Sequence, residues 1–239
     1  MANIALARLE TALAARKLDR TLTTALPPLE RQDGSAFVAT DVAALDMCLH
    51  GGLPRGQLSE IVGPQSSGRT SLCLQTIASA TRRGEIAALV DTFDRLDAAS
   101  AADAGIDLER LLWVRGHHSQ ISHALKALNL VLQSGGFGCV VLDLGDAPVV
   151  ELKRIPFTTW LRVQRVIEGS DTACVLLAPQ PLARSAGGLT LMLTGRTRWT
   201  GDADRSRHLT GADVTVRIAS PRRRVDGEVS VCAFSNDSH

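Results

Sequence analysis

The sequence predicts an α/β fold in which a mostly parallel central sheet is flanked by helices. Five short apolar runs alternate with helical stretches, and a glycine-rich loop follows the first run. Strands that are apolar throughout are typical of a parallel sheet that helices cover on both faces. The expected strands are residues 58–63, 85–91, 111–115, 138–144 and 173–179. The expected helices are residues 70–83, 95–104, 118–133 and 156–168.

The last part of the chain has a different pattern. Residues 213–218, "DVTVRI", and 228–234, "EVSVCAF", alternate with a period of two. This alternation is typical of strands with one solvated face, and "ASPRRRVDG" joins the two segments. We expect an antiparallel C-terminal hairpin at the edge of the sheet.

The N-terminal residues form a separate unit in this interpretation. Residues 2–19 are rich in alanine and leucine and predict a helix, whose apolar stripe contains Ala5, Leu9 and Leu13. Pro27, Pro28 and Gly34 then interrupt any helix. We therefore divide the chain into a helix and linker, 1–34, and a core domain, 35–239. The stripe either packs on its own core or docks on a neighbouring protomer, and the sequence leaves both open.

Composition excludes several classes of protein. Hydrophobic residues make up 45% of the chain and charged residues 21%, which is typical of a globular domain rather than a disordered one. The net charge of +1 gives no overall basic footprint for nucleic acid. No apolar run is long enough to span a membrane, and the five cysteines form no C-x-x-C pair. We expect a cytoplasmic protein with free thiols and no contact with a membrane.

The most informative motif is "GPQSSGRT", residues 63–70. It has the glycine spacing of the phosphate loop G-x-x-x-x-G-K-[ST], and it lies between an expected strand and an expected helix. Backbone N–H groups of such a loop and the helix N-terminus bind phosphate oxygens, and Thr70 would hold Mg²⁺. The candidate nucleotide-binding residues are Gly63, Ser66, Ser67, Gly68, Arg69, Thr70 and Ser71.

Arg69 stands where the motif has lysine. Lysine is a compact charge on a flexible stem, whereas arginine is planar and forked, so the two are not equivalent at a tightly wrapped site. Binding of the α- and β-phosphates by the backbone can survive this change. Orientation of the γ-phosphate, and with it hydrolysis, should suffer most.

A second acidic element is Asp143, which closes the apolar run 138–144. Phosphate-loop proteins place a Mg²⁺ ligand at the end of such a strand. The alternative is an aspartate that only caps the following turn. With the phosphate loop upstream, we favour the metal role, so Thr70 and Asp143 are the candidate metal residues.

These motifs occur in the order found in the RecA family. "GGLPRGQLSEIVGPQSSGRTSL", "AGIDLERLLWVR" and "CVVLDL" resemble RecA segments, and Gln180 in "LLAPQPLARSAGG" matches the glutamine that couples the γ-phosphate to a DNA-binding loop. The resemblance covers residues 37–234 and is most specific around 44–115. It implies a RecA-like core and a docking role for the N-terminal helix. ATP and Mg²⁺ are the candidate cofactors of such a core, and the departures from the family pattern count against them.

The departures from the RecA pattern concern the expected nucleotide site. The alignment places Phe93 where RecA has its catalytic glutamate, and Asp94 is expected to face away from the site. The segments that match the DNA-binding loops are short. A RecA core without robust ATPase residues resembles the ImuA-type accessory proteins of SOS mutagenesis. That resemblance implies translesion synthesis together with a polymerase-like adaptor and an error-prone polymerase, with RecA and a second copy as further partners.

Contacts to DNA or to a partner are expected to be weak or indirect. The candidates are Arg184, Arg196, Arg198, Trp199, Arg222, Arg223 and Arg224. Two other functions stay open. One is a RecA-type, DNA-dependent ATPase that uses Arg69 in place of lysine and Asp94 or another acid as base. The other is a phosphate-loop regulator with no role in DNA repair.

Overall fold

The computed structural model describes residues 36–116, 120–183, 188–201, 208–219 and 227–234. The expected N-terminal helix and linker, and therefore both docking alternatives, lie outside these residues. No helix in the described part of the chain is long and apolar enough to cross a membrane.

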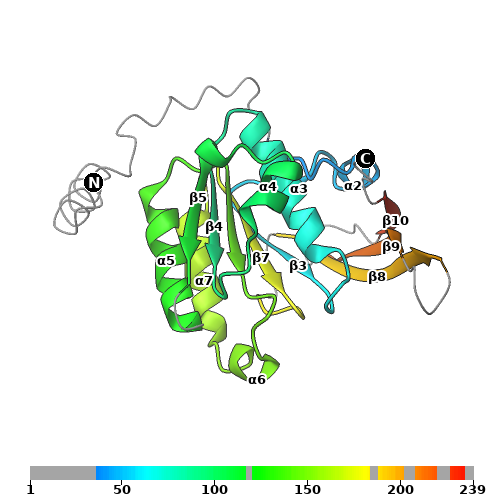
Figure 1. Ribbon diagram of the computed structural model, residues 1–239. Helices are drawn as coiled ribbons and strands as arrows, with labels where there is room; N and C mark the ends of the chain where they lie inside the picture. Colours follow the sequence, from blue (N-terminus) through cyan, green and yellow to red (C-terminus); the bar gives the residue numbers. More distant parts are fainter. Residues whose placement is uncertain (1–35, 117–119, 184–187, 202–207, 220–226, 235–239) are drawn as a thin grey trace.

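An eight-stranded mixed sheet forms the centre of the molecule (Figure 1). The strand order is β10-β9-β8-β3-β7-β6-β4-β5, and the six strands from β8 to β5 are parallel. The strands are β3 (Leu58–Val62), β4 (Ala87–Asp91), β5 (Leu111–Arg115), β6 (Cys139–Asp143), β7 (Ala173–Ala178), β8 (Thr190–Thr200), β9 (His208–Ala219) and β10 (Gly227–Phe234). The predicted fold class is therefore confirmed, including all five apolar strands.

The C-terminal hairpin is also confirmed, because β9 and β10 pair antiparallel at one end of the sheet. The sequence did not predict β8 as the long strand between this hairpin and β3. β8 pairs with β3 only over Thr190–Met192, and its remaining residues pair with β9 alone. A small second sheet, β1 (Phe37–Val38) and β2 (Leu53–Pro54), was not predicted either.

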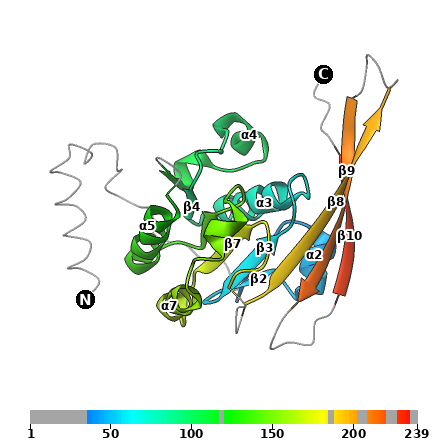
Figure 2. The ribbon, with the colours of Figure 1, turned by 90° about the horizontal axis from the view of Figure 1, so that it is seen from below.

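Helices cover both faces of the sheet (Figure 2). One face packs against α2 (Ala43–Cys48), α3 (Arg69–Arg82) and α4 (Ala98–Asp103). The other face packs against α5 (Ile121–Ser134), α6 (Val149–Leu152) and α7 (Phe157–Ile167). A short 3-10 turn, η1 (Leu108–Arg110), precedes β5. Adjacent residues of one strand, such as Val141 and Leu142, point into different cores, which explains why these strands are apolar throughout.

The start of α4 differs from the predicted helix, which began at residue 95. The backbone N–H groups of Arg95 and Leu96 donate to the Asp91 carboxylate, at 3.0 and 2.8 Å. Asp97 then accepts from Ser100 N and caps the helix. Residues 95–97 therefore form a turn held by Asp91, and the helix begins at Ala98.

Glu60 lies fully buried in β3 and fixes the segment that follows Gln180. Its Oε1 accepts from the N–H groups of Leu182 and Ala183, both at 2.7 Å, and Oε2 accepts from the Thr190 hydroxyl at 3.2 Å. A buried carboxylate is tolerated where donors surround it in this way. Glu60 therefore holds both ends of the short segment between β7 and β8.

We expect Glu60→Ala to lower the free energy of unfolding by about 3 kcal/mol, because two N–H groups lose their acceptor inside the protein. Glu60→Gln keeps an acceptor oxygen and should lose less. Urea unfolding measures both changes. The exposed residue Glu151 supplies the control, since Glu151→Ala should stay within about 0.5 kcal/mol of the unsubstituted protein. A Glu60→Ala protein as stable as this control would contradict the assignment.

Candidate nucleotide site

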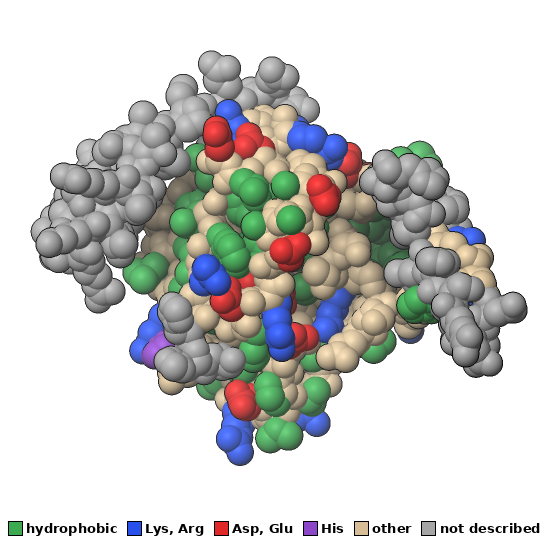
Figure 3. Space-filling model, viewed as in Figure 1, with side chains coloured by type: hydrophobic (Ala, Val, Ile, Leu, Met, Phe, Trp, Pro, Cys, Tyr) green, Lys and Arg blue, Asp and Glu red, His purple; other side chains and the backbone are tan. Residues whose placement is uncertain are grey.

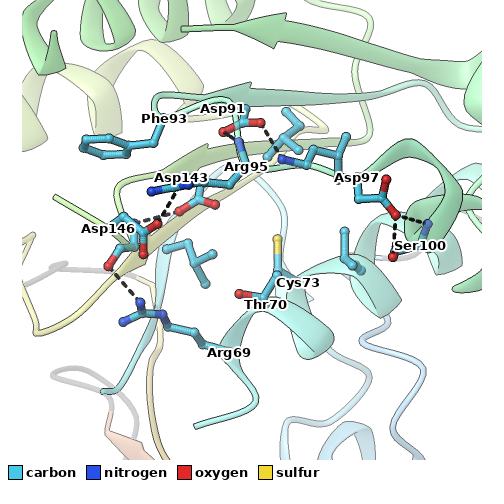
Figure 4. Close-up of a pocket in the computed structure, with 15 residues that line it drawn as sticks. Arg69, Thr70, Cys73, Asp91, Phe93, Arg95, Asp97, Ser100, Asp143 and Asp146 are labelled. Carbon is cyan, nitrogen blue, oxygen red and sulfur yellow. Dashed lines mark hydrogen bonds and ion pairs between the residues drawn. The ribbon is translucent and has the colours of Figure 1, made fainter. Parts of the chain in front are cut away.

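The candidate site is a cavity of about 250 Å³ at the carboxyl ends of the parallel strands (Figure 4). Its walls come from the first turns of α3, from the β4–α4 turn and from the loop after β6. Ligand sites in open parallel sheets form at this edge. The parallel register explains the position, because Asp91 at the end of β4 lies opposite Asp143 at the end of β6.

The phosphate loop lies between β3 and α3, as predicted, and its glycines are required by the packing. Gly68 has φ 88°, and a Cβ there would lie 2.9 Å from Val214 Cγ2. A Cβ on Gly63 would lie 2.4 Å from Leu193 O. The loop is therefore pressed against β8 and β9, and larger residues would displace it.

Several loop groups fit a phosphate ligand. The Ser67 hydroxyl is buried and has no hydrogen-bond partner within the described residues. A buried polar atom of this kind requires an explanation, such as a ligand or an ion. Thr70 and Ser71 are exposed in the first turn of α3, and Thr70 lines the cavity. The position of Thr70 therefore fits a ligand contact in the cavity, and phosphate binding by the loop stays a prediction.

Arg69 does not fit the role of the phosphate-loop lysine. Its side chain is 6% exposed and folds inward, where Nη1 donates to the carbonyl of Gly63 and Nη2 donates to the carbonyl of Gly145 at 2.8 Å. Its guanidinium ties the phosphate loop to the loop after β6 (Figure 4). Donors that are engaged in this way are not directed at a terminal phosphate.

Asp143 lines the cavity, and it also caps the turn that follows β6. Its Oδ1 accepts from Gly145 N at 2.7 Å, which is the bond expected of the capping alternative. Burial raises the pKa of this carboxyl to about 6, the Gly145 N–H opposes that shift, and the charge of Asp91 adds to it. The Mg²⁺ role of Thr70 and Asp143 stays a prediction. Among the described residues no group of three or more metal-ligating side chains forms a metal site.

Phe93 lies in the wall of the cavity. The resemblance to RecA predicts a catalytic glutamate at this position. Asp94 is not among the lining residues. Both of its carboxylate oxygens accept from Arg115, each at 2.7 Å, and Arg115 stacks on the ring of Trp113. The Asp94 side chain thus forms an ion pair outside the cavity, as expected, but for a different reason. Phe93 lies in the turn after β4 and Asp94 has φ 55°, so the alternation of an extended strand does not apply here.

Four charged residues of the cavity were not predicted: Asp91, Arg95, Asp97 and Asp146. Asp91 is buried and holds the β4–α4 turn, and Trp113 Nε1 also donates to it at 3.2 Å. Arg95 and Asp146 form an ion pair at 3.0 Å that joins the β4–α4 turn to the loop after β6. The sequence offers one indication of Asp91 as a site residue, because Asp91 ends an apolar strand as Asp143 does. Nothing in the sequence indicates that Arg95 pairs with Asp146.

The candidate coupling and DNA-contact residues lie away from this cavity. Gln180 is half-buried after the end of β7, and it is not a lining residue. Arg196, Arg198 and Trp199 are exposed on the outer half of β8, where Arg198 pairs with Asp213 at 2.8 Å. The remaining candidates, Arg184, Arg222, Arg223 and Arg224, lie outside the described residues.

Comparison with known proteins identifies the family of this chain. Residues 24–153, more than half of the chain, match the family described as RecA N-terminal domain. The chain belongs to the RecA family. Proteins named RecA from Clavibacter michiganensis and Rubrobacter xylanophilus are each 37% identical to it, over 140 and 139 residues. These alignments cover 52% of this chain and 38% and 40% of the two relatives.

The RecA of Ruminococcus albus is 30% identical over 192 residues, which cover 68% of this chain and 48% of that protein. The chain thus spans less than half of the length of these RecA relatives. The predicted RecA-like identity is confirmed at the level of the family. The narrower ImuA-type assignment stays a prediction.

The raised pKa of Asp143 predicts a pH-dependent stability. Between about pH 4 and pH 6 the folded state holds a proton that the unfolded state has released, so this carboxyl lowers stability as the pH rises. Asp143→Asn keeps the oxygen that accepts from Gly145 N and removes the charge. We expect it to raise the free energy of unfolding at pH 7 by roughly 2 kcal/mol.

At about pH 4 and below, the gain should vanish, because the carboxyl is then protonated in both states. Urea unfolding across this pH range measures the difference between the two proteins. Asp103→Asn, an exposed change on α4, is the matched control. A stabilisation that is constant with pH would show that the shift at Asp143 is absent.

Proposed function

We propose that this RecA-family chain is an accessory protein of SOS-induced translesion synthesis that acts through protein partners. In this proposal its nucleotide site hydrolyses ATP weakly or not at all. The observation that carries the proposal is the position of Arg69, which is buried and bonded to the carbonyls of Gly63 and Gly145.

Phosphoryl transfer depends on positioning and on charge placed at the transferring group. The guanidinium of Arg69 is engaged with two backbone carbonyls, so it is poorly placed for that task. A general base must also reach the attacking water. Phe93 carries no proton acceptor, and Asp94 is paired with Arg115. Two separate requirements of hydrolysis are therefore weakened at one site.

Nucleotide binding is a separate question, because the loop keeps its place between β3 and α3 and Thr70 lines the cavity. ATP would be held by the N–H groups of the phosphate loop, with Thr70 and Asp143 as the residues for Mg²⁺. Bound Mg²⁺ neutralises charge on the phosphates. Asp143 must lose its proton to bind a cation, so its raised pKa opposes metal binding at mildly acidic pH.

The proposed partners are a polymerase-like adaptor, an error-prone polymerase and RecA itself. The resemblance to ImuA-type accessory proteins supports this choice. A DNA-dependent ATPase of the RecA type is the second candidate. The exposed Thr70 favours it, because Thr70 lines the cavity and is available to a bound nucleotide.

ATP turnover of the purified chain tests the proposal, measured with and without single-stranded DNA. We expect turnover below about 0.1 s⁻¹ under both conditions, under the usual range of enzymes. Turnover above this value that requires DNA and is lost in Arg69→Ala would establish the ATPase alternative. Arg217→Ala on β9, an exposed arginine outside the cavity lining, is the control for loss of charge alone.

Restoring the residues of the RecA pattern at positions 69 and 93 should recover nucleotide binding first and hydrolysis second. Arg69→Lys removes the tie to Gly145 and should tighten the binding of a fluorescent ATP analogue by about tenfold. Hydrolysis should require Phe93→Glu in addition, since only the double variant has a base, and a positioned base contributes about 10² to 10⁴ in rate. Binding unchanged in Arg69→Lys would mean that Arg69 does not obstruct the site.

A further inference from the structure

The chain that follows Asp143 presents hydrophobic side chains to solvent. Val149 and Val150 in α6 are 39% and 65% exposed, and Phe157 and Leu161 in α7 are 46% and 39% exposed. We call these four residues the α6–α7 surface. Single exposed hydrophobic residues are common, but four within thirteen consecutive positions require an explanation.

The core of the protein does not use these side chains. α7 already buries a complete stripe against the sheet, with Trp160, Val163 and Ile167. Phe157 and Leu161 are four residues apart, so they form a second apolar row on the outer side of the same helix. A helix of a globular protein needs only one such face for its own fold. The second row is therefore available to another molecule.

Basic residues surround the α6–α7 surface. Lys153, Arg154, Arg162 and Arg165 are all exposed, and no ion pair of theirs is found among the described residues. Glu151 is the single acidic residue between positions 149 and 165, so four positive charges face one negative charge and the segment carries +3. Figure 3 shows hydrophobic side chains over α6, at the foot of the molecule, with Lys or Arg side chains beside them.

We propose that the α6–α7 surface binds an acidic amphipathic segment of a partner protein. An apolar centre with a charged rim is the usual composition of a protein interface, and the charge of the rim selects the sign of the partner. The apolar row would receive the hydrophobic face of the segment, and the four cations would meet its carboxylates. This inference rests on the proposed function, because it assigns a surface to a chain that acts through partners.

The chemistry of the surface favours protein over nucleic acid. Single-stranded nucleic acid binds to aromatic side chains on which bases stack. Here three of the four exposed hydrophobic residues are aliphatic, and Phe157 is the one aromatic ring among them. Cations alone would suffice for phosphates, whereas exposed valine and leucine add affinity only for another apolar surface.

The test uses the full chain and a fluorescein-labelled synthetic peptide. The peptide carries leucines at helical spacing and glutamates on both sides of them, and anisotropy measures its binding at low and high salt. The first variant is the double substitution Val150→Asp with Phe157→Asp, and the second is Lys153→Glu with Arg154→Glu. We expect each pair to lower affinity at least about tenfold, and the second pair to remove most of the salt dependence.

Matched controls place the same changes elsewhere. Met47→Asp alters a residue of α2 that is 76% exposed, and Arg217→Glu alters an exposed cation of β9. Both should bind the peptide as the unsubstituted chain does. A peptide in which lysines replace the glutamates should not bind. Thermal unfolding of each variant checks the fold. The charge-reversal pair changes two exposed residues, so it keeps the test informative if the apolar pair is unstable.

Three results would overturn the inference. The first is equal binding of the acidic peptide by the unsubstituted chain and both double variants, or no binding by any of them. The second is loss of oligothymidine binding in the variants with peptide binding unchanged, which would assign the surface to nucleic acid. The third is a different oligomeric state of the double variants and the unsubstituted chain in light scattering, which would assign the surface to a second copy of the chain. ATP turnover is measured separately, so failure of the proposed function is recognised independently of these results.

Discussion

The parallel register of β3, β7, β6 and β4 is the constraint on which the site depends. Because these strands run in one direction, the turns after all four open at the same edge of the sheet. The phosphate loop, Asp143 and Asp91 come from segments far apart in the sequence, and the register brings them around one cavity. The hydrogen bonds of the sheet, rather than any contact inside the cavity, determine this arrangement.

Two arginines join neighbouring segments to the loop after β6. Arg69 bonds to Gly145 from the phosphate loop, and Arg95 pairs with Asp146 from the β4–α4 turn. Asp143 bonds to Gly145 N within the same loop. Arg69, Arg95, Asp143 and Asp146 are therefore all engaged with other groups of the protein at this edge of the sheet. The proposal of a weakened ATPase rests on these contacts.

The loop after β6 also leads into α6 and α7. α6 begins six residues after Asp143, and α6 and α7 together carry the exposed apolar residues and their basic neighbours. The proposed partner surface therefore lies on the segments that follow the end of β6 rather than on the sheet. Function on such folds is determined by these local sites rather than by the fold itself.

Much of the fold and part of the site follow from short stretches of sequence. Apolar runs and the glycine spacing of residues 63–70 are local properties, so the sequence alone predicts the strands and the phosphate loop. It also names Phe93, which lines the cavity. The direction of the Arg69 side chain, the acceptor role of Glu60 and the pairing of Arg95 with Asp146 could not be predicted. Their partners lie 76, 122 to 130 and 51 positions away in the sequence. Only the tertiary structure brings such groups within hydrogen-bonding distance, because burial of the sheet between two helical layers, and not local propensity, decides which distant loops meet.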